Sequence, residues 1–199
     1  MHMHPNAPEN RDSSNPVANH ETVAFLESEA ALQQFVETWK AGKLPKSAWT
    51  HAAHVATAAY FAFDHTFEAT FAIMKAGILH HNTSVGTPNT EDNGYHETLT
   101  RFWSTEIGAF LRTGRFRSRL EAVRSSVNAF GEDRDRYRRF YSFDVVRDRR
   151  ARREWIAPDR KLPALAQGSA KSRSRNNNVC PGPRPPRAPS ELSTFPRIT

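Results

Sequence analysis

The sequence predicts an all-α fold, a compact bundle of about five to six helices followed by a disordered, basic, Pro-rich tail. Apolar residues recur at helical spacing in five successive segments. Gly, Pro or Asn stands between most of these segments, where helices commonly end. No stretch shows the apolar–polar alternation of a strand. We therefore expect one helical domain over residues 21–166, with disordered segments at residues 1–20 and 167–199.

The individual helices follow from their caps and apolar faces. The expected order is a helix over 22–41, capped by Thr22 and ended by Gly42; a second from Ser47 to about Phe63; a third opening at Thr66; a fourth from near Gly94 to about Thr113; and a fifth over about 118–130. A loop is expected over about 82–94, and one or two short helices in the arginine-rich segment that ends at Pro158. The second helix is apolar on nearly every side, which is typical of a buried central helix.

The positive charge of the chain lies mostly outside the predicted domain. The formal net charge is +7, and the residues from Gln167 onward contribute +5 of it, because six Lys or Arg residues stand there against Glu191 alone. The remaining +2 leaves the domain close to neutral, so we do not expect it to bind nucleic acid.

The sequence also lacks the features of secreted and membrane proteins. The first twenty residues contain no apolar signal segment, and the longest apolar stretch, "AAHVATAAYFAF", is too short to span a bilayer. The single cysteine, Cys180, excludes a disulfide within one chain and a Cys-based zinc site. We expect a cytoplasmic protein without a membrane partner.

Two histidine motifs form the candidate site. His51 and His54 are one turn apart on the predicted central helix, so both imidazoles lie on one face. His96 and Glu97 follow the long loop at the start of the fourth helix. Buried imidazoles require partners, and we expect these four residues to form one site. Structural alternatives remain open: the histidines could bond to backbone carbonyls, and Glu97 could form an i,i+4 ion pair with Arg101.

Three blocks of the sequence resemble an uncharacterised bacterial family of small all-helical proteins. The blocks are "LPKSAWTHAAHVATAAYF", "VGTPNTEDNGYHETLTRFW" and "FYSFDVVRDRRARREWIAPD". The resemblance covers about residues 25–165 and rests on a W-T-H-x-x-H helix and a G-Y-H-E-T helix start. Arg160 departs from the pattern, and the tail has no counterpart. The resemblance implies that His51, His54, His96 and Glu97 occupy motif positions, and it implies no reaction.

Three hypotheses follow for function. The first is a metal-dependent enzyme acting on a small molecule, with His51, His54 and His96 as ligands of a divalent ion such as zinc, iron or manganese. Glu97 and His96 would be its catalytic residues, and Tyr95, Asn89 and Arg101 would hold the substrate. The second keeps the site without a metal, for ligand binding or acid–base chemistry. The third is a non-catalytic interaction domain in which the nine arginines from Arg134 to Arg153 and the basic tail contact acidic partners or RNA. The alternative is that these arginines pair with acids of the bundle.

Overall fold

The chain forms helices throughout the part that the structure describes. The structure is a computed structural model that describes residues 24–160, and within this range it contains six α-helices, two short 3-10 helices and no strand. The α-helices are α2 (Glu29–Lys40), α3 (His51–Ala62), α4 (Phe67–Ser84), α5 (Glu97–Thr113), α6 (Arg119–Phe130) and α7 (Arg149–Arg153), and the 3-10 helices are Lys46–Ala48 and Arg136–Arg139. The predicted all-α fold is confirmed. The segments 1–20 and 167–199, predicted to be disordered, lie outside the described residues.

Two helix starts are capped as the sequence predicts. The Thr66 hydroxyl accepts a hydrogen bond from Ala69 N at 3.3 Å and begins α4. The Ser118 hydroxyl accepts from Glu121 N at 3.1 Å and begins α6. Each cap satisfies one backbone N–H group that the first helical turn leaves without a partner.

Two other predictions of helix bounds differ from the structure. The predicted helix over 22–41 is not continuous, because α2 begins at Glu29, where the Ser28 hydroxyl caps it by accepting from Ala31 N at 3.1 Å. Thr22 itself lies outside the described residues. Ser47 does not cap α3, because it lies inside the 3-10 helix that follows Pro45. Thr50 caps α3 instead, accepting from Ala53 N at 3.3 Å.

The loop before α5 is shifted relative to its predicted position. Helix α4 continues to Ser84, because the hydroxyls of Thr83 and Ser84 donate back to carbonyls one turn earlier and remain compatible with a helix. Gly94 does not start α5. It adopts a left-handed conformation with φ of +77°, and a Cβ there would lie 2.5 Å from Pro88 O. His96 is the N-cap of α5.

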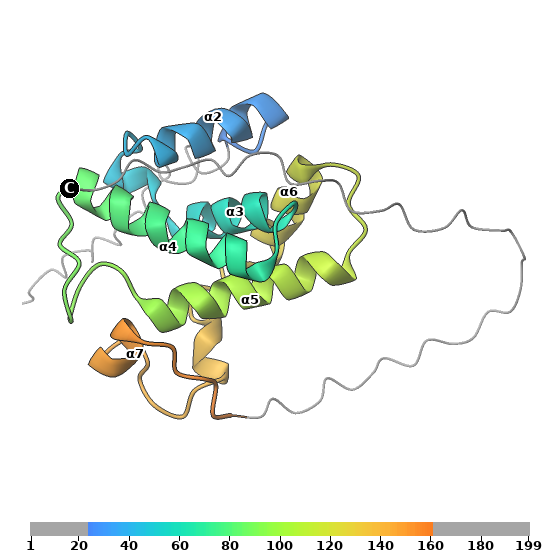
Figure 1. The fold of residues 1–199 in the computed structure, drawn as a ribbon. Coiled ribbons are helices and arrows are strands. Elements are labelled where there is room, and N and C mark those ends of the chain that lie inside the picture. The colour runs from blue at the N-terminus through green and yellow to red at the C-terminus, as the bar shows by residue number, and fades with distance from the viewer. Residues whose placement is uncertain (1–23, 161–199) are drawn as a thin grey trace, which may run out of the picture.

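Helix α3 lies at the centre of the bundle, as predicted. Figure 1 shows it behind α4 and between α2 and α5, and it packs against α4, α5 and α6. Ala53, Ala56 and Ala59 are completely buried, which allows these neighbours to approach its backbone closely. Among residues 24–160, no helix has the length and apolarity needed to cross a bilayer.

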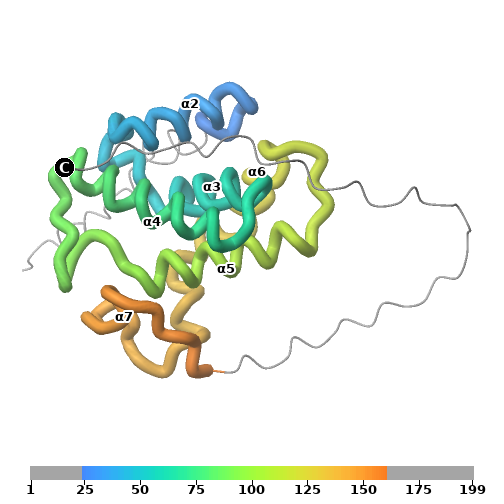
Figure 2. Tube along the Cα trace, viewed as in Figure 1, coloured from blue at the N-terminus to red at the C-terminus, as the bar shows by residue number. Residues whose placement is uncertain are grey.

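The chain after α6 folds back along α5. Figure 2 traces this segment below α5 to α7, which lies beside the loop between α4 and α5. Ion pairs join the two, with Arg149 Nε 2.8 Å from Asp92 Oδ1 and Arg153 paired with Glu91. A second apolar cluster forms between α5 and this segment, around Phe102, Tyr141 and Val145. The segment thereby covers the end of the bundle where α5 begins.

We expect enlargement of the central helix to destabilise the fold. Ala56→Leu adds three carbon atoms where neighbouring helices leave no space, and such overpacking costs about 1–3 kcal/mol in the free energy of unfolding. Urea denaturation measures the change. Ala30→Leu, at an exposed position of α2, is the matched control and should change stability by less than about 0.5 kcal/mol. Equal stabilities for the two variants would contradict the central packing of α3.

Candidate functional site

His51 and His54 extend from the first turn of α3 into the same cavity. The Thr50 cap places His51 as the first helical residue and His54 one turn later. The Nε2–H of His51 donates to Phe130 O at 3.1 Å, which leaves Nδ1 with a lone pair. The His51 ring lies edge-on to Trp103, with 4.7 Å between ring centroids. The backbone carbonyl at the end of α6 therefore fixes the orientation of His51.

Of the three histidines that line this cavity, His54 is the one with both ring nitrogens outside any hydrogen bond within residues 24–160. Its ring lies against the indole of Trp49 at 4.0 Å, and no hydrogen bond among residues 24–160 engages either ring nitrogen. Burial lowers the pKa of His54 to about 3, since an imidazolium there would lose its hydration, and the neighbouring His51 and His81 add to this effect. Burial also lowers the pKa of His51. Both imidazoles are neutral at pH 7, so His54 offers one donor and one acceptor, whereas His51, whose N–H is bonded to Phe130 O, offers one acceptor.

His96 is committed to the backbone at both ring nitrogens. Leu99 N donates to Nδ1 at 3.3 Å, which caps α5, and Nε2–H donates to Val145 O at 2.9 Å. The side chain is buried, and this burial lowers its pKa to about 4, with a smaller contribution from the positive charge of Arg152. His96 therefore joins the start of α5 to the segment that folds back over it.

Glu97 is not among the residues that line this cavity, although it is bonded to Tyr95, which does line it. Its Oε2 accepts hydrogen bonds from Lys75 Nζ at 2.7 Å and from the Tyr95 hydroxyl at 2.9 Å. Burial, followed by the bond to Glu97, raises the pKa of Tyr95. The alternative ion pair between Glu97 and Arg101 does not form, because the Arg101 guanidinium lies over aromatic rings, 5.2 Å from the centroid of Phe67.

Three residues, Tyr95, Asn89 and Arg101, were predicted to bind substrate. Of these, Tyr95 alone is part of the wall of the cavity that contains His51 and His54. Asn89 organises the loop, where its Oδ1 accepts from Asn82 Nδ2 at 2.8 Å and from Tyr95 N at 3.0 Å. Arg101 stacks on Phe67, Phe71 and Trp155 on another face of α5. Asn89 and Arg101 hold the surrounding structure and do not line this cavity.

The cavity, which we call the histidine cavity, has a volume of about 420 Å³. This is within the range of small-molecule sites. Its mouth carries the exposed residues Arg134 and Asp135, and no Lys, Arg, Asp or Glu lies deeper in its wall. The remaining lining residues are His51, His54, Ala58, Met74, Ile78, Gly94, Tyr95, His96, Leu99, Thr100, Trp103, Ser104, Tyr137 and Val146. The interior is therefore apolar, with neutral polar groups.

The three histidines do not form a metal-ligand set as they stand. Among residues 24–160, no group of three or more His, Cys, Asp or Glu side chains is arranged to hold a metal ion. His51 and His54 retain ring lone pairs, whereas His96 uses both nitrogens for backbone hydrogen bonds. A three-histidine site would require His96 to give up its cap and its bond to Val145.

Many residues of the cavity wall were not predicted from the sequence. Leu99, Thr100, Trp103 and Ser104 continue the face of α5 that begins at His96, and their spacing of three, four, seven and eight residues could have revealed them. Arg134, Tyr137 and Val146 carry no such signal. They reach the cavity because the chain after α6 returns along α5.

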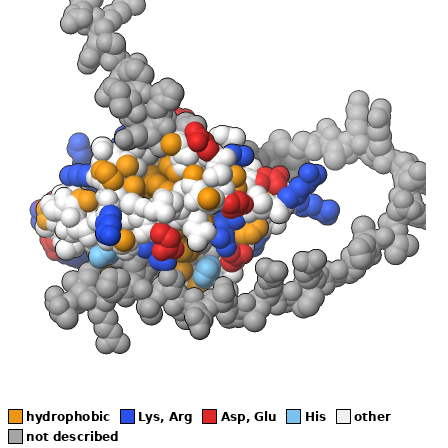
Figure 3. All heavy atoms as spheres, turned by 90° about the horizontal axis from the view of Figure 1, so that it is seen from above, with side chains coloured by type: hydrophobic (Ala, Val, Ile, Leu, Met, Phe, Trp, Pro, Cys, Tyr) orange, Lys and Arg blue, Asp and Glu red, His pale blue; other side chains and the backbone are white. Residues whose placement is uncertain are grey.

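The arginine-rich segment is largely paired with acids of the domain. Arg136 Nε lies 2.8 Å from Glu106 Oε2, and Arg149 and Arg153 pair with acids of the loop before α5. Arg134, at the cavity mouth, makes no ion pair among the described residues. On the upper face of Figure 1, which lies away from this segment and is seen in Figure 3, Lys and Arg also stand among Asp and Glu. This pairing favours a structural role for the segment, and the absence of nucleic-acid binding stays a prediction.

Comparisons with family models, with curated proteins and with solved structures found no match. The resemblance of the three sequence blocks to a bacterial family stays a prediction.

Neutral buried histidines should make the fold sensitive to acid. In the unfolded chain His96 has an ordinary pKa of 6.5, whereas in the folded protein its pKa is about 4. Between these two values the unfolded chain binds more protons, so stability falls as the pH drops, by up to about 1.4 kcal/mol per pH unit for this group. Urea denaturation at pH 7, 6 and 5 measures the loss.

The variant His96→Asn tests the contribution of this imidazole. Asparagine can still cap α5 but does not titrate. The variant should be less stable at pH 7, because the bond to Val145 O is lost, and its stability should fall less steeply below pH 6.5. An unchanged pH dependence would contradict the assignment of this acid sensitivity to His96.

Proposed function

We propose that this domain binds a small, uncharged aromatic or heterocyclic molecule in the histidine cavity. The observation that carries the proposal is His54, a neutral imidazole in the cavity wall that has neither nitrogen in a hydrogen bond within residues 24–160. A polar group in a cavity wall that has no protein partner is available to a bound molecule. A ligand with a matching donor or acceptor would compensate this one.

The lining defines the chemistry of the ligand. Met74, Ile78, Leu99 and Val146 offer apolar contacts, and the ring of Trp103 offers an aromatic face. His51 Nδ1 supplies a second acceptor close to His54. A charged group deep in the cavity would find no counterion there, and burying an unpaired charge is costly. The buried part of the ligand is therefore uncharged, with one or two hydrogen-bonding atoms directed at the histidines.

For His54, a role in binding a ligand is better supported than a role in acid–base catalysis. An imidazole with a pKa of about 3 is a weak base at neutral pH and does not carry a proton to donate as an acid. It remains an effective hydrogen-bond partner in its neutral form. The metal-dependent enzyme with His51, His54 and His96 as ligands and Glu97 as base stays a second candidate. It requires rearrangement of His96 and Glu97, which are held by other partners.

We expect uncharged aromatic fragments to bind through His54. Indole, quinoline and benzamide are suitable probes, and the indole N–H resonance of Trp103 should shift on binding in ¹H–¹⁵N spectra. His54→Leu keeps the apolar volume and removes both ring nitrogens, so the affinity of fragments that bond to it should fall about tenfold, equivalent to about 1.4 kcal/mol. His65→Leu, which changes an exposed histidine outside this cavity, is the matched control.

Two results would contradict this proposal. The first is that none of the three probes perturbs the Trp103 resonance at millimolar concentration. The second is that His54→Leu and His65→Leu bind the probes with equal affinity, which would show that the histidine does not take part.

Metal analysis separates the two candidate functions. Protein freed of its tag and washed with chelator should contain less than about 0.1 equivalent of zinc, iron or manganese if the cavity works without a metal. Stoichiometric metal that is lost in His51→Ala would instead favour the metal-dependent enzyme. Metal retained in His51→Ala would place the ion elsewhere in the chain.

A further inference from the structure

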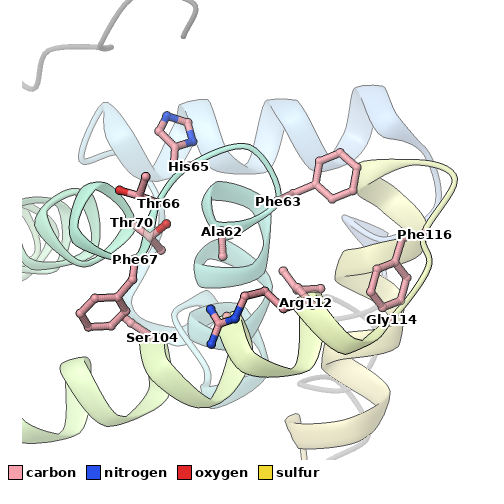
Figure 4. A pocket seen from close by; sticks show the side chains of 12 residues that line it. Ala62, Phe63, His65, Thr66, Phe67, Thr70, Ser104, Arg112, Gly114 and Phe116 are labelled. Carbon is pink, nitrogen blue, oxygen red and sulfur yellow. The ribbon is translucent and has the colours of Figure 1, made fainter. Parts of the chain in front are cut away.

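A second cavity lies on the other side of α5, away from the arginine-rich segment. It has a volume of about 420 Å³ and is enclosed by the end of α3, the first turn of α4 and the C-terminal half of α5. Figure 4 shows the side chains that line it, with Thr70 on α4 and Arg112 on α5. Ser104 is shared with the histidine cavity, and the other lining residues differ.

Arg112 gives this cavity a positive charge. It is the one Lys or Arg side chain in the lining, and no Asp or Glu lines the cavity. Within residues 24–160 the guanidinium makes no ion pair, in contrast to Arg119 nearby, which pairs with Asp64. Figure 4 shows the Arg112 side chain directed back along α5 toward the turn that holds Ser104. An unpaired guanidinium at a cavity is suited to a carboxylate, which it can bind with two parallel hydrogen bonds.

Gly108 leaves room for this guanidinium. It is a buried residue inside α5, where glycine is unfavourable compared with alanine. A Cβ at this position would lie 3.3 Å from Arg112 Nη1. The absence of a side chain at Gly108 therefore lets the guanidinium lie against the helix at the cavity wall.

Thr70 adds a polar group without a partner. Its side chain is 1% exposed, and its hydroxyl has no hydrogen bond among the described residues. The buried hydroxyls of Thr57, Ser104 and Ser126 each donate to a carbonyl one turn earlier, as Thr57 does to Ala53 O at 2.9 Å. Buried polar groups without partners are unfavourable. A ligand oxygen that reached the Thr70 hydroxyl would give it the partner that it lacks.

We propose that this second cavity binds a small organic carboxylate. Arg112 would hold the carboxylate, the Thr70 hydroxyl would add a hydrogen bond, and the apolar body would contact Phe63, Phe67 and Leu111. The site does not depend on the proposed function of the histidine cavity, because its charge and its lining are different. The histidine cavity takes an uncharged group in its interior, whereas this cavity takes an anion.

The probe for this site is benzoate, with benzamide as its uncharged counterpart of similar shape. Binding is followed by the amide resonances of Thr70 and Gly108 in ¹H–¹⁵N spectra. Benzoate should shift them, and benzamide should bind at these residues at least tenfold more weakly. The variant Arg112→Met should weaken benzoate binding at least tenfold. Arg115→Met removes the same charge three residues away and outside the cavity, so it should change the affinity less than twofold.

Gly108→Ala is a second test that does not rely on loss of charge. Alanine favours the helix and should raise the melting temperature, while its Cβ, 3.3 Å from Arg112 Nη1, shifts the guanidinium slightly and should weaken benzoate binding less than Arg112→Met does. His54→Leu should leave benzoate binding unchanged, which separates this site from the histidine cavity. The proposal is overturned if benzoate does not shift Thr70 and Gly108 at 10 mM, if Arg112→Met and Arg115→Met bind it equally, or if inorganic phosphate binds at least as tightly.

Discussion

The close packing of α3 determines most of what this domain can do. A helix surrounded by three others has no face in water, so every polar side chain on it must be neutral or paired. Its alanines permit this packing because they end at Cβ. His51 and His54 lie on the same helix and are partly buried with these alanines. Burial lowers the pKa of both imidazoles, so both are neutral at pH 7. The neutral imidazoles of the candidate site are a direct result of the composition of this helix.

The start of α5 is the second point on which the structure depends. The Thr98 hydroxyl donates to Glu154 O at 2.8 Å and accepts from Ile156 N at 3.0 Å, while His96 donates to Val145 O. These bonds fasten the chain after α6 to the helix. Val146 and Tyr137, from the same returning segment, then complete the wall of the histidine cavity. The cavity thus exists because backbone groups of an irregular segment find partners at one helix terminus.

The positions of the helices could be predicted from the sequence more accurately than the contacts between them. Helical spacing and local capping are short-range properties, so the starts at Thr66 and Ser118 and the central place of α3 could be inferred. Which of two neighbouring residues caps a helix could not be inferred from the sequence. Thr50 rather than Ser47 begins α3, because residues 46–48 first form a 3-10 helix, and both residues are suitable caps on propensity alone.

The site was predictable where it depends on one helix and unpredictable where distant segments meet. The prediction that His51, His54 and His96 lie together agrees with their place in the wall of one cavity, but the polar partner expected for His54 is not found among residues 24–160. The partners of Glu97 were missed, since Lys75 lies on α4 and pairs with it only in the folded bundle. Arg134 was missed for the same reason.

Ser104 stands in the wall of both cavities. Its hydroxyl donates to Thr100 O at 2.8 Å, so its side chain is held against the helix and takes up little space on either side. A larger residue at this position would reduce the volume of both cavities, and a smaller residue would increase it. The shapes of the two chambers therefore cannot evolve independently at this position. If the two cavities bind the ligands proposed above, a substitution at residue 104 that adapted one cavity to a new ligand would also change the other.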